Sequence, residues 1–344
     1  MDEVAWIASL TPWPEEFGLD RMGSLLDALD HPERAFPAVH VVGSNGKSTA
    51  TRTIAAFLRA EGLRIGAYTS PHVSGWHERL DTDEETFARA VARVRPAAER
   101  LDSTQFEALT AAALAHFASE EVDAAVVEAG LGGRLDATNV LDARVVHLTN
   151  VSLEHADVLG ETREQIAREK LAVAGPNAIV VLGEPEWAHL VPSNEVCNGG
   201  ALEAAEAFLG RRLRAQPEAV ALPGRLEWRS DAELWDGAHT PEGVDWLLGH
   251  LDRRDWVVVA SLLRDKEVEG ILRRLSRAGR TLVATRSSNA RALPEKELAT
   301  RGEPYFDRVE TAADPVEALA LARRLGPVLA TGSLYLLADL HAKS

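Results

Sequence analysis

A glycine-rich segment that follows an apolar stretch carries the first recognisable chemistry in this sequence. It reads Val39-His-Val-Val-Gly-Ser-Asn-Gly-Lys-Ser-Thr49. Its glycines permit backbone bends that a Cβ would forbid, and the N–H groups of such a turn and of a following helix can surround an anion. Lys47 can reach terminal phosphates, and the hydroxyls after it can contact phosphate or Mg²⁺. The G-x-x-G-K-[ST] pattern, two residues shorter than the usual P-loop spacing, favours phosphate binding over an ordinary strand-to-helix turn. The residues expected to contact phosphate are Gly43, Ser44, Asn45, Gly46, Lys47, Ser48 and Thr49.

Other polar residues stand at or just after the ends of apolar stretches. Ser70 follows the stretch 63–69, Glu128 ends 124–128, and a polar segment from Asn150 to His155 follows 144–149. Ligands of parallel sheets bind outside the carboxyl ends of the strands, so we expect these residues to converge on the glycine-rich turn. A carboxylate at the end of an apolar strand is costly unless it is paired or bound to a metal. Glu128 is therefore expected either to bind a metal or to pair with Arg134.

The elements that must position these residues alternate along the whole chain. Strands are predicted at 38–42, 63–69, 124–128, 144–149 and 178–182, and helices at 48–60, 83–100, 106–118, 163–173 and 201–209. After a segment with Pro and Gly at 221–227, strands are predicted at 233–235, 256–262, 281–285 and 328–331, and helices from Pro241 onward and at 268–278, 294–300 and 315–325. This alternation predicts an α/β fold with a mainly parallel sheet in a P-loop domain at 1–221 and a Rossmann-like α/β domain at 222–344.

Composition narrows the function classes. The 344 residues suffice for two domains, and the net charge of −16 disfavours nucleic acid, which binds proteins through Lys and Arg. No apolar run is long enough to span a bilayer, and the acidic N-terminus does not resemble a signal peptide. Cys197 is the single cysteine, which excludes a disulfide framework. We expect a cytoplasmic protein without nucleic-acid or membrane partners.

Several segments occur in an order typical of one family. The longest is Glu128-Ala-Gly-Leu-Gly-Gly-Arg-Leu-Asp-Ala-Thr-Asn139, and Glu154-His155 and Arg168-Glu-Lys170 come after it. The other segments lie at 40–49, 68–72, 78–79, 106–107, 223–227, 236–239, 265–266 and 331–335. Together they cover nearly the whole chain and resemble the folylpolyglutamate synthase and dihydrofolate synthase family of the Mur ligase superfamily.

This resemblance implies an ATP-dependent amide ligase. ATP would phosphorylate a carboxylate, either of dihydropteroate or of the glutamate tail of a folate, and the amine of L-glutamate would attack the acyl phosphate. Two Mg²⁺ ions are implied, with Ser70, Glu128, His155 and a carbamylated Lys170 as ligands; a plain solvated lysine is the alternative for Lys170. The catalytic residues implied are Lys47, Glu128, His155 and Lys170. The resemblance also implies a monomer that binds only small molecules.

Further residues are implied for the two larger substrates. Asn198 would contact the adenine, and Arg225, Asp236 and His239 would contact the rest of ATP from the linker and second domain. Thr240 stands where the family has asparagine, and it can still cap the next helix. For the acid, with Phe106 either stacked on an aromatic ring or packed in the core, the resemblance implies Leu19, Asp20, Arg21, Thr104, Gln105, Phe106, Glu107, Leu135, Asp136 and Ala137.

The chain is shorter than the family pattern in two places. A β-hairpin is missing after Leu80, and several dozen residues of a small β-region are missing between Glu186 and Asn198. Loss of peripheral strands leaves the ATP chemistry intact but can reshape the acid pocket. Two alternatives therefore stay open: the same ligase chemistry on a non-folate acid, and a nucleotide-binding module without ligase activity.

Overall fold

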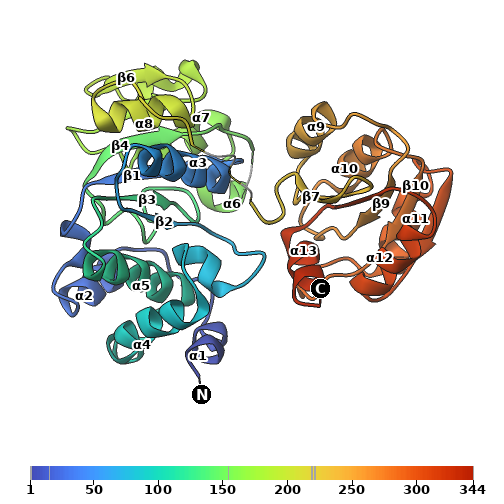
Figure 1. Ribbon diagram of the computed structural model, residues 1–344, viewed down its shortest axis with the longest axis horizontal. Helices are drawn as coiled ribbons and strands as arrows, with labels where there is room; N and C mark the ends of the chain where they lie inside the picture. Colours follow the sequence, from blue (N-terminus) through green and yellow to red (C-terminus); the bar gives the residue numbers. More distant parts are fainter. Residues whose placement is uncertain (1, 15, 154, 218–219, 221, 344) are drawn as a thin grey trace. The chain divides into compact units, whose positions relative to one another are not determined.

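The computed structural model describes residues 2–14, 16–153, 155–217, 220 and 222–343. Glu154 of the sequence motif and residue 221 at the predicted domain limit lie outside this range. The chain forms two compact units, Met1–Ser70 with Trp76–Val220, and Pro71–Gly75 with Ala221–Ser344. Each unit contains a six-stranded sheet with helices on both faces (Figure 1). The predicted α/β class, with a mainly parallel sheet followed by a second α/β domain, is confirmed.

The first sheet is parallel throughout and has the order β2-β3-β1-β4-β5-β6. The central strand β1 therefore lies between β3 and β4, and both loops that follow these neighbours emerge at the same edge as the glycine-rich turn. Its strands are β1 (Ala38–Val42), β2 (Ile65–Tyr68), β3 (Ala124–Glu128), β4 (Ala143–Leu148), β5 (Ile179–Leu182) and β6 (Glu195–Asn198).

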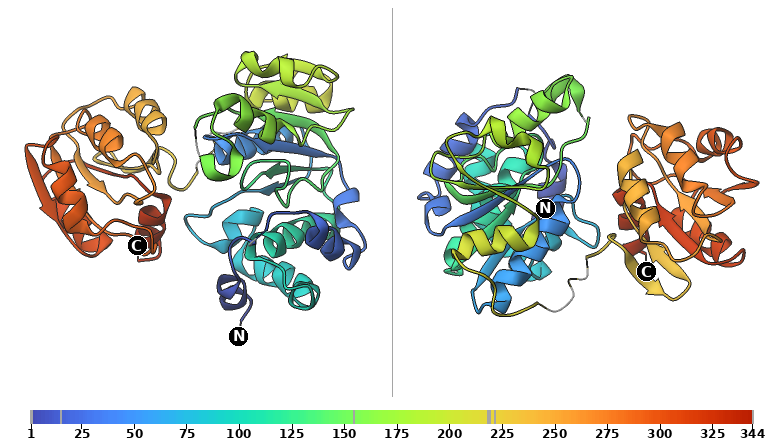
Figure 2. Two further views of the ribbon diagram at one scale, coloured as in Figure 1. Left: turned by 180° about the vertical axis from the view of Figure 1, so that it is seen from behind. Right: turned by 90° about the horizontal axis from the view of Figure 1, so that it is seen from above.

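Two helical layers cover this sheet, as the views in Figure 2 show. On one face α3 (Lys47–Ala60) and α8 (Ala201–Leu209) pack on Val39, Val41 and Val126. On the other face one cluster joins Ala38, Ala125 and Val127 to α1 (Glu3–Ser9), α2 (Asp20–Asp27), α4 (Glu84–Arg100) and α5 (Gln105–Ser119). A second cluster on that face joins Val146 and Val180 to α7 (Arg163–Leu171). This division follows from the two-residue period of the strands.

The connections contain short helices of three to six residues. These are η1 (Pro32–Arg34), η2 (Trp76–Leu80), α6 (Ala156–Leu159) and η3 (Pro185–Leu190). At the first family gap, η2 leads through Asp81 directly to Asp83, whose side chain caps α4. At the second gap, η3 alone connects the adjacent parallel strands β5 and β6. Both short connections lie outside the central strands β1, β3 and β4 and the loops that follow these strands.

The second unit has the strand order β11-β10-β9-β12-β8-β7, in which only β7 runs antiparallel to its neighbour. Its strands are β7 (Glu227–Ser230), β8 (Glu233–Trp235), β9 (Val257–Ala260), β10 (Thr281–Ala284), β11 (Arg308–Thr311) and β12 (Val328–Thr331). The helices α9 (Pro241–Gly249), α10 (Val268–Leu275) and α11 (Glu295–Gly302) cover one face, and α12 (Pro315–Arg323) and α13 (Leu334–His341) cover the other.

Candidate active site

Two glycines shape the turn after β1. Gly43 has φ +148° and lies against Thr149, so that a Cβ at this position would overlap the Thr149 hydroxyl. Gly46 has φ +77° and precedes the first residue of α3. The first backbone N–H groups of α3 lack partners within the helix, as at every helix N-terminus. They begin at Lys47 and face the same turn, which is the arrangement needed to bind an anion.

The segment after β4 holds this turn in place. The backbone N–H of Asn45 donates to Asn150 Oδ1 at 2.9 Å, and the Thr149 hydroxyl donates to the carbonyl of Asn45 at 2.8 Å. The Ser152 N–H donates to Ser44 Oγ at 3.0 Å. The sequence placed this segment near the turn but did not assign Thr149, Asn150 and Ser152 as its supports. Their position directly after a strand next to β1 was the available signal.

Two lysines meet at one carbonyl group of the turn. Lys47 Nζ donates to the carbonyl of Gly43 at 3.0 Å, and Lys170 Nζ donates to the same oxygen at 2.9 Å. Lys170 is only 2% exposed although it lies on α7. The alternative of a solvated helix lysine is therefore wrong for Lys170. The structure brings Lys170 to the turn that contains Lys47.

Glu128 is the carboxylate at this edge of the sheet. It is 2% exposed, and its Oε1 accepts a hydrogen bond from the Ser48 hydroxyl at 3.0 Å, while its Oε2 accepts one from the backbone N–H of Ser70 at 2.9 Å. The ion pair considered for Arg134 forms with Glu169 instead, at 2.9 Å. Ser48, Ser70 and Glu128 thus present hydroxyl, carbonyl and carboxylate oxygens in one place, which are the donors that Mg²⁺ prefers.

His155 lies on the stretch between β4 and α6. It is exposed, has φ +46°, and its carbonyl accepts hydrogen bonds from the N–H groups of Val158 and Leu159. Within the described residues no group of three or more His, Cys, Asp or Glu side chains is arranged to hold a metal ion. A metal at this edge would therefore depend on mixed donors such as Ser48, Ser70 and Glu128, and the role of His155 stays a prediction.

Several residues expected to bind the acid lie together. Arg21 Nε donates to both carboxylate oxygens of Glu107 at 3.0 and 2.8 Å, and Glu107 accepts further hydrogen bonds from the N–H and hydroxyl of Thr104. Thr104 caps α5, with Glu107 as its reciprocal partner. Gln105 differs, because its side chain donates to the carbonyl of Ile7 in α1. Asp20 is the first residue of α2, and Leu19 precedes it as the N-cap.

Phe106 is 6% exposed and lies against Gly130, where a Cβ would come within 2.5 Å of its ring. Its ring centroid is 5.4 Å from that of Trp13 and 6.1 Å from that of Tyr68. Trp13 is 43% exposed and belongs to a loop to which the sequence analysis assigned no function. The burial of Phe106 fits the alternative that this residue packs in the core. Trp13 is the more accessible aromatic side chain next to it.

Asp136 is buried inside its own loop. Its Oδ2 accepts hydrogen bonds from the N–H groups of Gly130 and Leu131 at 3.0 and 2.8 Å, and its Oδ1 accepts from the N–H and hydroxyl of Thr138. Burial raises the pKa of Asp136, and these hydrogen bonds oppose the rise. The carboxylate thus organises the loop. Its neighbours Leu135 and Ala137 lie on the same loop, half-buried and buried respectively.

Known proteins resemble this chain in sequence and in fold. Residues 41–182 match the model of the Mur ligase middle domain. A dihydrofolate synthase/folylpolyglutamate synthase of Mycobacterium tuberculosis is 32% identical, and the match covers 91% of this chain and 84% of that protein. Its alignment spans 411 positions, more than the 344 residues of this chain, so it includes gaps.

The chain belongs to the folylpolyglutamate synthase and dihydrofolate synthase family. Escherichia coli FolC in complex with DHPP and ADP has a TM-score of 0.89 and 25% identity, with coverage of 100% of this chain and 97% of that one. A bifunctional family member from Yersinia pestis, complexed with AMPPNP and Mn ion, has a TM-score of 0.87 and 26% identity, covering 100% and 98% of the two chains.

In this family member the candidate nucleotide residues of the second unit lie on two adjacent segments, with Asp236 and His239 after β8 and Arg225 before β7. Asp236 is buried, and its carboxylate accepts hydrogen bonds from the N–H groups of Leu226 and Ala238, both at 2.9 Å. Burial raises the pKa of Asp236. Arg225 donates to the carbonyl of Gly224, and a ring nitrogen of His239 lies 2.7 Å from the carbonyl of Gly237. In the first unit, Asn198 ends β6 and is exposed.

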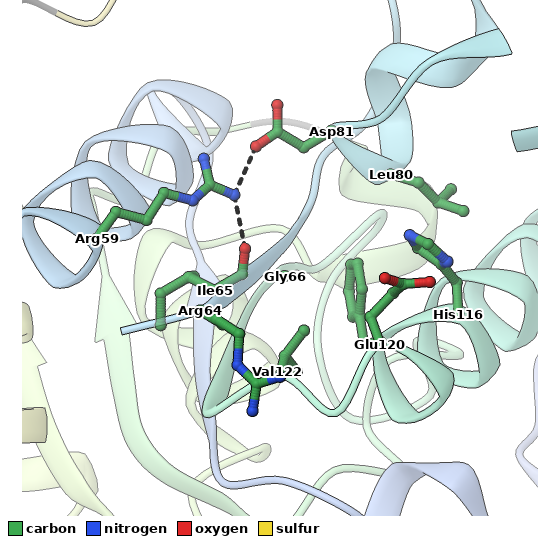
Figure 3. Close-up of a pocket in the computed structure, with 10 residues that line it drawn as sticks. Arg59, Arg64, Ile65, Gly66, Leu80, Asp81, His116, Glu120 and Val122 are labelled. Atoms are coloured by element: carbon green, nitrogen blue, oxygen red, sulfur yellow. Dashed lines mark hydrogen bonds and ion pairs between the residues drawn. The ribbon is translucent and has the colours of Figure 1, made fainter. Parts of the chain in front are cut away.

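A pocket of about 310 Å³ lies elsewhere in the first unit, at the start of β2 and beside the ends of α3 and α5 (Figure 3). Arg59 contributes to it and pairs with Asp81 at 2.7 Å while also donating to the carbonyl of Ile65 at 2.6 Å. None of the residues predicted for the site lines this pocket. Ile65 begins the strand whose other end leads to Ser70, so the pocket and the candidate site lie at opposite ends of β2.

Within the described parts of the chain, none of the helices combines the length and the apolar character needed to cross a lipid bilayer.

Proposed function

We propose that this chain catalyses the ATP-dependent addition of L-glutamate to a folate-type acid, through an acyl phosphate. The observation that carries the proposal is the position of Glu128. Its two carboxylate oxygens accept hydrogen bonds from Ser48 at the start of α3 and from Ser70 after β2. A buried carboxylate directly beside an anion-binding turn fits a magnesium triphosphate rather than phosphate alone.

The turn would bind the phosphates of ATP. The N–H groups at the start of α3 would donate to the phosphates, and Lys47 would exchange its hydrogen bonds to the carbonyls of Gly43 and Ser44 for phosphate oxygens. Thr149, Asn150 and Ser152 hold the turn in this shape before ATP arrives. The cost of ordering the turn is therefore met during folding rather than during binding.

Ser48, Ser70 and Glu128 would hold a divalent metal ion. Such an ion neutralises phosphate charge as the phosphoryl group moves. We further propose a second metal position that uses His155 and a carbamylated Lys170. Carbamylation would convert the Lys170 amine into an anionic metal ligand, and Lys170 is 2% exposed with its Nζ at the turn proposed to bind the phosphates.

The reaction balances with the groups named. A carboxylate oxygen of the acid attacks the γ-phosphorus of ATP, which releases ADP and leaves the acyl phosphate. The amine of glutamate then attacks the acyl carbon, the amine loses a proton, and phosphate departs as the amide forms. Arg21, Thr104 and Glu107 are the residues proposed to position the acid, because the structure brings these three together. Arg225, Asp236, His239 and Asn198 stay predictions for ATP binding.

The deciding experiment is a phosphate-release assay with dihydropteroate and tetrahydrofolate offered separately, each with ATP, Mg²⁺ and glutamate. Release that depends on both the acid and glutamate supports the proposal, and the preferred acid assigns the dihydrofolate synthase or the polyglutamate activity. Release only with other carboxylic acids would support a ligase with a reshaped pocket. ATP binding without acid-dependent release would identify a module that has lost ligation. A monomer in the cytoplasm is proposed as well, and light scattering tests the monomer.

A further inference from the structure

We propose that His40 is a positioning residue that connects strand β1 to the loop after β3. This loop, residues 129–139, is called the acid loop here because it contains Leu135, Asp136 and Ala137. The inference rests on the proposed function in so far as the acid loop is taken to bind the acid. His40 would hold the acid loop in place through its hydrogen bond to Thr138, which in turn is bonded to Asp136.

His40 is fully buried on the central strand, three residues before Gly43. Its Nε2 lies 2.8 Å from the hydroxyl oxygen of Thr138, and that hydroxyl donates its single proton to Asp136 Oδ1. The histidine must then donate from Nε2 to Thr138. Its Nδ1 is left without a partner among the described residues, although buried polar atoms are usually paired. The contact with Thr138 is therefore the one side-chain hydrogen bond that holds the His40 ring among the described residues.

The hydrogen bonds continue into the acid loop. Asp136 receives the Thr138 hydroxyl at Oδ1 and gathers the N–H groups of Gly130 and Leu131 at Oδ2. These two residues follow directly after Glu128 and Ala129. One chain of side chains thus runs from β1 through Thr138 and Asp136 to the beginning of the acid loop.

The acid loop has no room to shift without moving the candidate site. Gly130 lies against Phe106, where a Cβ would come within 2.5 Å of the ring. Gly133 lies against α7, where a Cβ would come within 2.6 Å of the carbonyl of Lys170, and the Arg134 N–H donates to the carbonyl of Glu169. By contrast, the glycine-rich turn is held by Thr149, Asn150 and Ser152. Loss of the His40 bond should therefore loosen the acid side and spare the ATP side.

The test uses paired substitutions in the full-length protein. His40→Leu and Thr138→Val remove the bond with little change in volume, while His40→Gln and Thr138→Ser keep an N–H or hydroxyl in place. Phosphate release is measured with the acid and ATP varied in turn. We expect the KM for the acid to rise about ten-fold in His40→Leu and Thr138→Val, with the KM for ATP within about two-fold. The conservative variants should restore the KM, and the double variant should be no worse than either single one.

His147→Leu is the matched control. His147 is also buried, on the neighbouring strand β4, and its Nδ1 lies 3.1 Å from the carbonyl of Val181, away from the acid loop. This variant should lose stability without a change in the KM for the acid. The proposal is overturned if His40→Leu leaves that KM unchanged, if both KM values rise together, or if His147→Leu has the same effect.

A second measurement keeps the inference separate from the identity of the acid. Hydrogen exchange at the backbone N–H groups of Gly130 and Leu131 should be about ten-fold faster in His40→Leu and Thr138→Val than in the unmodified protein and His147→Leu. Unchanged exchange refutes the link even if a folate-type acid is turned over. Faster exchange in a protein that turns over no folate-type acid supports the link while the proposed function fails.

Discussion

Glu128 illustrates how a single residue combines a structural and a chemical role. Its carboxylate is almost fully buried, and a buried charge is costly unless it is compensated. Hydrogen bonds from the Ser48 hydroxyl and the Ser70 N–H supply part of the compensation, and the Arg52 guanidinium attracts the Glu128 charge as well. A metal ion would add two positive charges beside the same carboxylate. Glu128 therefore ends β3 within the fold and is also the carboxylate proposed to bind the metal.

Replacement of Glu128 by glutamine removes the charge and keeps the shape. We expect the rate of acid-dependent phosphate release to fall by at least about 100-fold, because a ligand of the metal is lost. The melting temperature should stay within a few degrees, because the amide oxygen still accepts one of the two hydrogen bonds. Glu99→Gln, on the exposed side of α4, is the control and should keep nearly the full rate. Near-normal turnover in Glu128→Gln would contradict the assigned role.

Lys170 gives a second prediction for a single residue. If its amine carries a carbamate, removal of dissolved CO₂ and bicarbonate should lower the rate of phosphate release several-fold, and added bicarbonate should restore it. Lys170→Ala should be slow under both conditions. Labelling with ¹³C bicarbonate offers a direct measurement, since a carbamate carbon would appear in the spectrum of the protein and not in that of Lys170→Ala. A rate that is independent of CO₂ would mean that Lys170 acts as an amine.

At the level of elements, an arginine pair closes the first family gap. Arg52 on α3 contacts both the Asp81 carboxylate and the carbonyl of Glu78, and Arg59 pairs with the other oxygen of Asp81 at 2.7 Å. Thr69, next to Ser70, donates from its N–H to the carbonyl of Arg79. The short connection from η2 to α4 is thereby fixed to α3 at Glu78 and Asp81. The loop that contains Ser70 is thereby held beside α3 at the position of the first predicted gap.

Asp81→Asn tests this arrangement. Asn tolerates the left-handed backbone at this position, where φ is +53°, so the change isolates the charge. Arg52, whose side chain is 11% exposed, would lose its ion pair with Asp81, and we expect the free energy of unfolding to fall by about 1–3 kcal/mol in urea. Glu85→Gln breaks an exposed pair with Arg89 and should cost less than about 0.5 kcal/mol. Equal effects of the two variants would rule out the arrangement.

Periodicity predicted most elements of the chain, and the reasons for the exceptions are physical. β1, β3, β8, β12 and α8 match the predicted ranges, because each is an apolar run or amphipathic stretch with clear turn residues at its ends. The strands β6, β7 and β11 were missed because they lie at sheet edges and carry polar, partly exposed residues such as Glu195 and Arg308.

The candidate site was predictable to a similar degree. The glycine-rich turn and Glu128 follow from local pattern and strand position. The burial of Lys170 does not, because it depends on α7 packing against the turn of a strand 127 residues away. The hydrogen bond between His40 and Thr138 joins residues 98 positions apart, so no local pattern in the sequence predicts it.

At the level of the whole molecule, buried histidines make stability depend on pH. Burial lowers the pKa of His40 from 6.5 to about 4, and burial also lowers the pKa of His147. The unfolded chain therefore binds more protons than the folded one between pH 6.5 and 4, and stability falls as the pH is lowered through that range. The pKa values of Glu61 and Glu227 are lowered from 4.5 to about 2. These two groups therefore reduce stability only when the pH falls below about 4.5.

His40→Gln should remove the part of this pH dependence that belongs to one side chain. A shift from 6.5 to about 4 predicts that His40 lowers the free energy of unfolding by about 2 kcal/mol between pH 7 and pH 5. Urea unfolding at pH 7, 6 and 5 would measure the slope in the unmodified protein and in His40→Gln, and the variant should show the smaller loss. His189→Gln, at an exposed histidine, is the control and should leave the slope unchanged. If the free energy of unfolding falls equally with pH in the unmodified protein and in His40→Gln, His40 accepts a proton without unfolding of the chain. The hydrogen bond between His40 and Thr138 would then not depend on a neutral ring.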